Sequence, residues 1–274
     1  MKTNDKTAAN PSWKNAILLG IAALALFALP GVALATDCLP LTTWSGAVDH
    51  NWFTAGNWNN GVPDSGTAAL INNGGTAQIN ASLPAANACS LTLNPGNVSV
   101  GSVGSLQVTY STTGIVVGGT GAIPSLLTAT GSVTATTVVV NTSGTLTGNG
   151  TVSTTSGTKI YGTLAPGPGR LTISNGDLSF LGSAPLMESS VTPTSQDNVY
   201  VSAGAAALTG KLSVKMTGNF TAGTTYTLLH AENGLFGTTF SSVSITYPCE
   251  CFTPQIQYTT KDVNLYLAPA ACCQ

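Results

Sequence analysis

The sequence predicts an all-β protein whose main body is a right-handed, single-stranded parallel β-helix, that is, a solenoid. Three observations lead to this prediction. Short β-branched runs recur along the chain with Gly, Asn or Pro between them. No segment after residue 35 places apolar residues with helical spacing. Charged residues make up only 7% of the chain.

The predicted strands include residues 105–110, 114–118 and 137–140, and most runs begin about 7 to 10 residues apart. This rhythm fits an antiparallel sandwich or barrel, or a solenoid with about three strands in each coil. Between Trp58 and Tyr161 the only aromatic residue is Tyr110. Because the outer faces of sandwiches usually carry more aromatic and charged residues, composition favours the solenoid, which tolerates ladders of small and polar residues.

Residues 1–35 are typical of an export signal. Three lysines precede an uncharged apolar run at 16–29, and the triplet at 33–35 fits a cleavage site after Ala35. The alternative is an uncleaved anchor, since residues 16–35 are long enough to span a bilayer. The favoured prediction is a secreted or cell-surface protein whose mature chain is not inserted in a membrane.

Residues 36–64 are predicted to form an N-terminal cap. Trp44, Trp52 and Trp58 lie within fifteen residues, and Trp13 is the only other tryptophan. A solenoid exposes apolar core and strand edges at its ends, and bulky side chains there prevent aggregation. The alternative is a sugar-binding platform, for which Trp52, Trp58 and Asp49 are the candidate carbohydrate contacts.

The solenoid is expected over residues 65–176, followed at 177–274 by a C-terminal closing β module with a cysteine-rich tail. An even cysteine count behind an export signal indicates disulfides, and their clustering suggests one clamp at each end. The alternative is a soft-metal site in the tail. The candidate residues are Cys38, Cys89, Cys249, Cys251, Cys272 and Cys273.

The charged residues argue against several functions. After residue 35 the sequence has only five basic residues and nine acidic ones, so it lacks the positive charge that a nucleic-acid-binding surface needs. Lyases and hydrolases need clustered carboxylates, yet the 112 residues between Asp64 and Asp177 contain no Asp or Glu. No G-x-S-x-G motif occurs. His230 is expected to be a satisfied or solvent-facing imidazole. The sequence therefore predicts a non-catalytic protein with no cofactor and no metal.

Several segments resemble a known family. The segment "TWSGAVDHNWFTAGNWNNGVPDSGTAALIN" and residues 144–180, 197–240 and 263–269 are similar to secreted β-helical proteins of the autotransporter passenger type. The resemblance implies a bacterial surface protein with a β-helical fold. One departure is that the sequence ends five residues after Pro269, without the strands of a membrane barrel. We therefore expect a passenger-like region without the barrel.

Together these observations predict an exported cell-surface or extracellular structural or adhesive protein, with self-assembly into fibres as a variant. Its expected partners are other copies of itself, stacked end to end, or surface polysaccharide and other cell-surface proteins. Threonine pairs such as Thr128 with Thr130, and Thr134 with Thr136, would suit contact with ice or crystalline polysaccharide. The alternative function is a carbohydrate-binding module or accessory protein, and a β-helical polysaccharide-degrading enzyme is the third.

Overall fold

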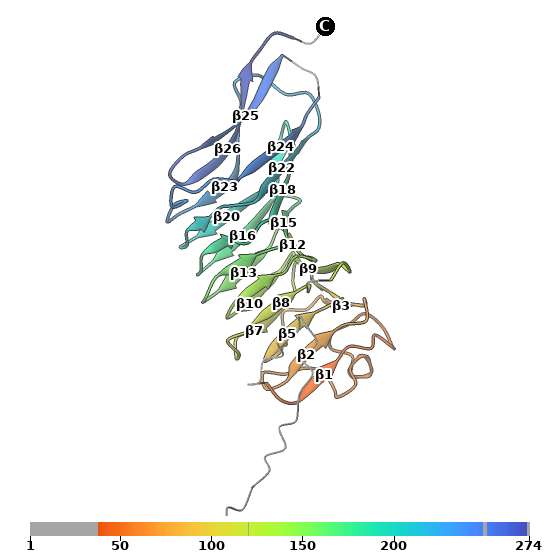
Figure 1. The fold of residues 1–274 in the computed structure, drawn as a ribbon. Coiled ribbons are helices and arrows are strands. Elements are labelled where there is room, and N and C mark those ends of the chain that lie inside the picture. Colours follow the sequence, from red (N-terminus) through yellow and green to blue (C-terminus); the bar gives the residue numbers. More distant parts are fainter. Residues whose placement is uncertain (1–37, 120, 249–250, 273–274) are drawn as a thin grey trace, which may run out of the picture. The chain divides into compact units, whose positions relative to one another are not determined.

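The computed structural model describes residues 38–119, 121–248 and 251–272, which belong to one compact unit. The expected export signal at 1–35 lies outside the described residues. The structure confirms the solenoid: three long sheets stack their strands in sequence order, and successive strands within each sheet pair in parallel until the C-terminal end (Figure 1). No helix among the described residues is long and apolar enough to cross a membrane.

Each coil of the solenoid contributes one strand to each sheet. Sheet 1 contains β1 (Leu41–Thr43), β2 (Ala68–Ile71), β5 (Ser90–Leu93), β8 (Ile115–Val117), β11 (Val138–Val140), β14 (Thr158–Ile160), β17 (Leu178–Phe180) and β21 (Ala206–Ala207). Sheet 2 contains β3 (Thr76–Ile79), β6 (Asn97–Val100), β9 (Ser125–Ala129), β12 (Gly144–Gly148), β15 (Thr163–Pro166), β18 (Leu186–Thr192), β22 (Lys211–Met216) and β24 (Ser242–Thr246). Sheet 3 contains β4 (Ala86–Asn87), β7 (Ser105–Val108), β10 (Ser132–Ala135), β13 (Thr151–Thr154), β16 (Arg170–Ser174), β20 (Asn198–Ser202), β23 (Thr225–Ala231), β26 (Asp262–Pro269) and β25 (Phe252–Tyr258).

Alternation along each strand separates the core from the outer faces. Leu106, Val133 and Val152 stand opposite one another on neighbouring strands of sheet 3, and each is 0% exposed. The intervening residues, such as Thr134, point outward. Because the side chains of a strand alternate between its two faces, the same pattern repeated coil after coil builds one continuous apolar core.

Glycine lets the turn between sheets 2 and 3 stack in successive coils. A Cβ atom on Gly131 would lie 2.4 Å from the carbonyl oxygen of Gly104, and one on Gly150 would lie 2.2 Å from that of Gly131. No side chain fits at such a distance, so the coils can approach to the spacing of paired strands only if these positions remain glycine.

The N-terminal cap closes the first coil. β1 pairs with β2 at the edge of sheet 1, and Asn51 forms a bridge to Gln78 at the edge of sheet 2. A 3₁₀ turn, η1 (Ala55–Asn57), folds the cap loop back toward β1. The cap thus covers the first edge of both sheets with its own backbone.

The parallel stacking does not end at residue 176, the expected end of the solenoid. β17, β18 and β20 each pair in parallel with the next coil, and β22 pairs in parallel with β24. The arrangement changes only where β26 runs antiparallel to β23 and β25 antiparallel to β26. A short β19 (Ser195–Gln196) forms a hairpin with β18. The closing module therefore combines further coils with a terminal hairpin.

Candidate functional site

Ionisable side chains gather at one place on the outer face of sheet 3. All three ion pairs found among the described residues lie there and connect His230, Glu232, Lys261 and Asp262. We call the group the His230 cluster and define it as Arg170, Tyr200, His230, Glu232, Lys261 and Asp262. In a chain with 7% charged residues, this gathering marks the most electrostatically structured part of the surface.

Strand register brings the cluster together from distant parts of the sequence. Tyr200 on β20 stands opposite His230 on β23, and His230 stands opposite Asp262 on β26. Glu232 follows two residues after His230, so its side chain lies on the same side of the chain. Because the pairing of β23 with β26 is antiparallel, the cluster forms where parallel stacking gives way to the terminal hairpin.

Short polar contacts hold the cluster together. Nδ1 of His230 lies 2.6 Å from Oδ1 of Asp262, and Nε2 lies 3.6 Å from Oε1 of Glu232. The Tyr200 hydroxyl donates a hydrogen bond to Oε1 of Glu232 at 2.6 Å, and Nζ of Lys261 lies 3.6 Å from the other oxygen. The His230 imidazole is therefore satisfied by carboxylates, as expected from the sequence.

Aromatic stacking adds a flat surface to the cluster. The rings of Tyr200 and His230 are nearly parallel, with an interplanar angle of 20° and centroids 5.5 Å apart. The Arg170 guanidinium carbon lies 5.1 Å from the centroid of the Tyr200 ring, within cation–π range. These side chains border a surface pocket of about 390 Å³ that Asn198 and Thr227 also line.

The hydrogen bond between Tyr200 and Glu232 shifts the pKa of both side chains. It raises the pKa of the Tyr200 phenol above its ordinary value of 10.0 and lowers the pKa of the Glu232 carboxyl below 4.5. Both shifts favour the neutral phenol and the ionised carboxylate, the two states that make the bond. At neutral pH the cluster therefore presents ordered donors and acceptors beside a ring stack, which is the chemistry of sugar contact.

The tryptophans of the cap are buried. The exposed fractions of Trp52 and Trp58 are 0% and 4%, and Nε1 of Trp58 donates to the backbone oxygen of Trp52 at 2.8 Å. Trp58 also packs edge-on against Trp44 and Trp52, with centroids 5.0 and 4.9 Å away. Sugar stacking needs an exposed indole face, so the burial of Trp52 and Trp58 argues against the alternative in which they contact carbohydrate; their rings fill the end of the core.

Asp49, the third residue of the carbohydrate alternative, makes its hydrogen bonds within the cap. Its Oδ1 accepts hydrogen bonds from the Asn57 side chain at 2.6 Å and from the Asn51 backbone at 2.8 Å, and its Oδ2 accepts one from Thr54 at 3.0 Å. The Asn57 bond is the main reason why the pKa of Asp49 lies below 3.8. The carboxylate therefore orders the cap loop.

A shallow pocket does adjoin the cap. It measures about 350 Å³ and is lined by Trp52 together with Phe53, Asn87 and Tyr110. Since Trp52 itself is 0% exposed and Tyr110 is 60% exposed, any ligand would contact Tyr110 rather than the indole. Sequence reasoning missed this placement because Tyr110 follows β7, two coils after the cap in the sequence.

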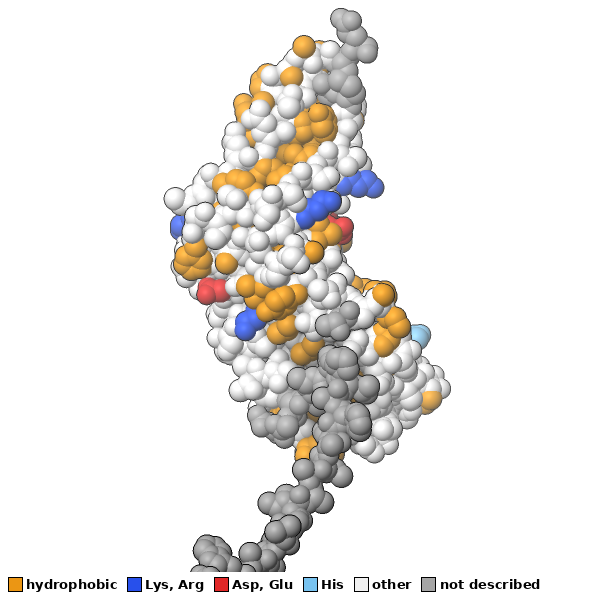
Figure 2. Space-filling model, in the orientation of Figure 1, with side chains coloured by type: hydrophobic (Ala, Val, Ile, Leu, Met, Phe, Trp, Pro, Cys, Tyr) orange, Lys and Arg blue, Asp and Glu red, His pale blue; other side chains and the backbone are white. Residues whose placement is uncertain are grey.

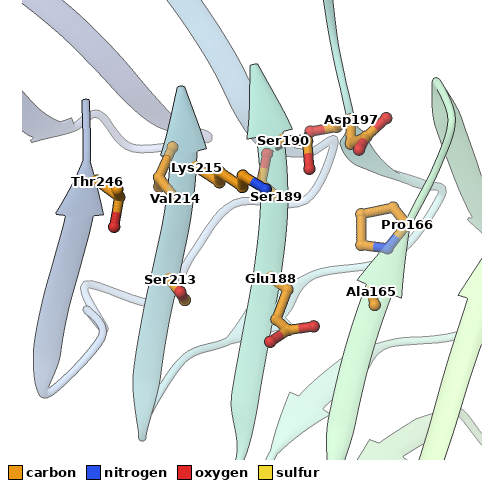
Figure 3. A pocket seen from close by; sticks show the side chains of 10 residues that line it. All are labelled: Ala165, Pro166, Glu188, Ser189, Ser190, Asp197, Ser213, Val214, Lys215 and Thr246. Atoms are coloured by element: carbon orange, nitrogen blue, oxygen red, sulfur yellow. Dashed lines mark hydrogen bonds between the residues drawn. The ribbon is translucent and has the colours of Figure 1, made fainter. Parts of the chain in front are cut away.

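A second polar pocket, of about 440 Å³, lies on the outer face of sheet 2 (Figure 3). Asp197 stands at its rim, fixed by the Gly169 N–H at 2.8 Å, and the Ser189 hydroxyl donates to the Asp197 backbone oxygen at 2.7 Å. Glu188 and Lys215 also line it, on neighbouring strands. The pocket is open and polar, without the aromatic surface of the His230 cluster.

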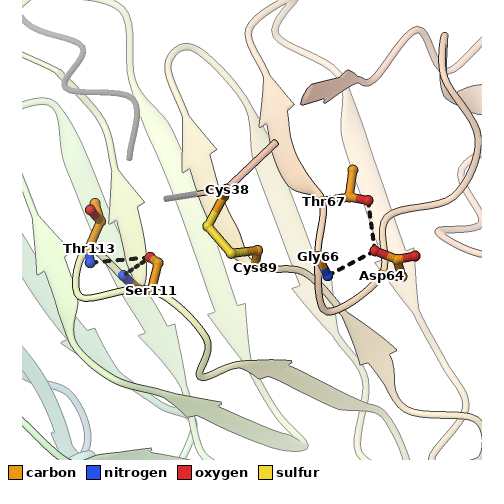
Figure 4. The surroundings of a disulfide bond; sticks show 8 residues. Cys38, Asp64, Gly66, Thr67, Cys89, Ser111 and Thr113 are labelled. Atoms are coloured by element: carbon orange, nitrogen blue, oxygen red, sulfur yellow. Dashed lines mark hydrogen bonds between the residues drawn. A yellow bond between two sulfur atoms is a disulfide. The ribbon is translucent and has the colours of Figure 1, made fainter. Parts of the chain in front are cut away.

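Disulfides clamp both ends, as the cysteine clustering predicted. Cys38 bonds to Cys89 beside the first coils (Figure 4), and Cys251 bonds to Cys272 across the terminal hairpin. Cys249 and Cys273 lie outside the described residues. Because the sulfurs of Cys251 and Cys272 are bonded to each other, they are not free to bind a soft metal, and the alternative of a four-cysteine metal site was wrong. The bonds indicate an oxidising, exported environment.

Comparison of the chain with protein-family models finds no match, and comparison with curated proteins finds none either.

Proposed function

We propose that this protein is an exported, non-catalytic structural and adhesive element that contacts polysaccharide through the outer face of sheet 3. The observation that carries the proposal is a polar row that runs along this face and ends in the His230 cluster. The row consists of Ser105, Ser132, Thr151, Thr172, Tyr200, His230 and Asp262, which stand opposite one another on successive strands.

The spacing of this row suits a polymeric ligand. Neighbouring strands lie about 4.8 Å apart, so the row repeats a hydroxyl at that interval over several coils. Hydroxyl side chains donate and accept hydrogen bonds, as sugar hydroxyls do. Its uncharged stretch favours a neutral polysaccharide, and the stacked rings at its end supply an apolar surface for a sugar face.

The disulfides and the closed N-terminal end support the structural part of the proposal. A bond at each end restricts local unfolding there, and fraying ends are where proteases begin. The autotransporter-passenger resemblance agrees with an extracellular location. In this proposal the solenoid is a durable support, and the row on sheet 3 is the contact surface.

Binding to insoluble neutral polysaccharides, such as cellulose and chitin, tests the contact. We expect Tyr200→Ala to weaken retention about tenfold, because it removes the ring stack. Tyr200→Phe keeps the ring and loses only the bond to Glu232, so it should retain most of the binding. Lys159→Ala on the outer face of sheet 1 is the matched control and should bind as the parent does.

Failure of the parent chain to bind any of these polymers, or equal binding by Tyr200→Ala, would overturn the polysaccharide contact. Export is tested separately by cell fractionation and by the N-terminal residue of the external protein, which we expect to be Thr36 after cleavage behind Ala35. Recovery of the chain only inside the cell would contradict the extracellular part of the proposal.

A further inference from the structure

The strand β24 leaves one edge of sheet 2 open. It pairs with β22 on one side, and no other described strand pairs with its second side. Four of its five residues, Ser242, Val243, Ser244 and Thr246, are exposed. An unpaired strand edge is a template for a further strand, and proteins that avoid this usually protect the edge.

The backbone N–H and C=O groups of β24 point alternately to β22 and to the open edge. The Ser242 N–H donates to the Gly210 oxygen on the β22 side at 3.1 Å. Because successive residues of a parallel strand direct their N–H and C=O groups to opposite sides, the groups of Ser244 face β22 as those of Ser242 do. The N–H and C=O groups of Val243 and Ile245 therefore point to the open edge.

The side chains of the same two residues form an uncovered end of the core. Val243 stands opposite Leu212, and Ile245 opposite Val214. Leu212 and Val214 are 0% and 1% exposed, whereas Val243 is 41% exposed although it continues the same core row. Hydrophobic side chains gather on the surface over the region of β24 (Figure 2).

The sequence of β24 is complementary to itself. Ser-Val-Ser-Ile-Thr contains no charge and no proline, the devices that commonly protect an edge. Placed antiparallel to a second copy and centred on Ser244, it sets Val243 opposite Ile245 and Ser242 opposite Thr246. Apolar residues then face apolar residues on one side of the joined sheet, and hydroxyls face hydroxyls on the other.

We propose that two copies of this chain form a closed two-fold dimer by antiparallel pairing of their β24 strands. Val243 of each copy and Ile245 of the other form a pair that exchanges both backbone hydrogen bonds, and Ser244 faces its own counterpart without such bonds. The pairing also covers the exposed end of the core row. It does not depend on polysaccharide binding.

The opposite end of the solenoid explains why the assembly closes at two copies. End-to-end stacking would pair β24 of one copy with the first edge of sheet 2 in the next copy, but the bridge from Asn51 to Gln78 already occupies that edge. A two-fold contact uses the same edge on both copies and leaves none for a third. The expected fibre of stacked copies is thereby replaced by a dimer.

Sedimentation of the oxidised mature chain tests the dimer. Pairing over one short strand buries little area, so we expect a dissociation constant on the order of 10 to 100 µM. Val243→Lys should leave only monomer at the same concentrations, because it places a charge in the joined apolar row. Val103→Lys adds the same charge at a turn residue that is 63% exposed and should dimerise as the parent does.

Cysteine crosslinking tests the register without disturbing the core. In the proposed dimer the two Ser244 Cα atoms lie about 4.5 Å apart, within disulfide reach. Ser244→Cys should give a covalent dimer under mild oxidation. Ser242→Cys, whose copies would lie about 14 Å apart, should not.

A parent chain that stays monomeric up to about 300 µM, or forms larger species with increasing concentration, would overturn the proposal. So would equal crosslinking of the two cysteine variants. Circular dichroism of each variant, and a peptide map of the native disulfides, show that the fold is intact. A dimer that binds no polysaccharide would leave this inference standing while the proposed function fails.

Discussion

The two ends of the solenoid solve the same problem differently. At the N-terminal end, Trp44, Trp52 and Trp58 are at most 4% exposed, and backbone pairing covers the first edges of sheets 1 and 2. At the C-terminal end, Phe236 is 71% exposed and Val243 is 41% exposed. The tryptophan rings cover the core at the first end, whereas at the second end a core row and one edge of sheet 2 remain open at β24.

The difference in exposure follows from where the aromatic side chains that cover each end come from in the sequence. The cap brings three large rings into mutual contact from one short segment, so they exclude water together. At the C-terminal end the aromatic contacts join residues far apart in the sequence, such as Phe180 with Phe240 and Phe220 with Phe252, and they leave Phe236 71% exposed. Head-to-tail stacking joins the last edge of one copy to the first edge of the next, so covering the first edge prevents it and leaves the last edge free to make a specific contact.

The largest expected effect is at the N-terminal end. Trp52→Ala removes a fully buried indole and should lower the free energy of unfolding by about 3 to 5 kcal/mol. Phe236→Ala removes a ring of similar kind at the other end, but this ring is 71% exposed, so the loss should stay below about 1 kcal/mol. Urea unfolding of both variants measures the contrast. Equal losses would show that the two ends are not covered differently.

The two disulfides should stabilise the protein by different amounts. Cys38 and Cys89 are separated by 51 residues, and Cys251 and Cys272 by 21. In the chain-entropy description a longer loop stabilises more, so replacing the first pair with serine should cost about 4 kcal/mol and the second about 3 kcal/mol. The order, measured by chemical unfolding, is the prediction. A larger cost for the 251–272 pair would mean that the C-terminal end depends more on its clamp.

The smallest expected difference between the two ends is in how their stability changes as the pH falls. The pKa of Glu232 is lowered from 4.5 mainly by the Tyr200 hydroxyl, and that of Asp49 from 3.8 mainly by the Asn57 side chain. A lowered pKa contributes stability that is present above the unfolded value and is lost as the pH falls through the folded value. The contribution of Glu232 should therefore begin to fall at a higher pH than that of Asp49.

Thermal unfolding from about pH 6 to about pH 2 tests this order. Glu232→Gln should be less stable than the parent at the upper end, and the difference should vanish as the parent's own carboxylate becomes protonated. Asp49→Asn should behave in the same way, with its difference beginning to shrink at a lower pH. Differences that are independent of pH would assign the effects to packing rather than to charge.

The strands of the solenoid could be predicted because alternation is local. Val133 and Thr134 show by their types which face each one takes, and glycines such as Gly131 mark the turns. The end clamps could be predicted because the cysteines cluster near the termini. The His230 cluster could not, since Tyr200, His230 and Asp262 meet only through strand register, and single charges far apart in sequence give no such signal.

The sequence by itself determined the solenoid, its uncharged surface and the need for bulky side chains at its ends, because repeated alternation and small turn residues admit few other stable packings. Only the tertiary structure decided which tryptophans are covered, how far the parallel stacking continues and which edge stays open. These depend on contacts between coils, and exposure is a property of the whole packed chain. Trp52 and Val243 are both apolar in the sequence, but only packing leaves one at 0% and the other at 41% exposure.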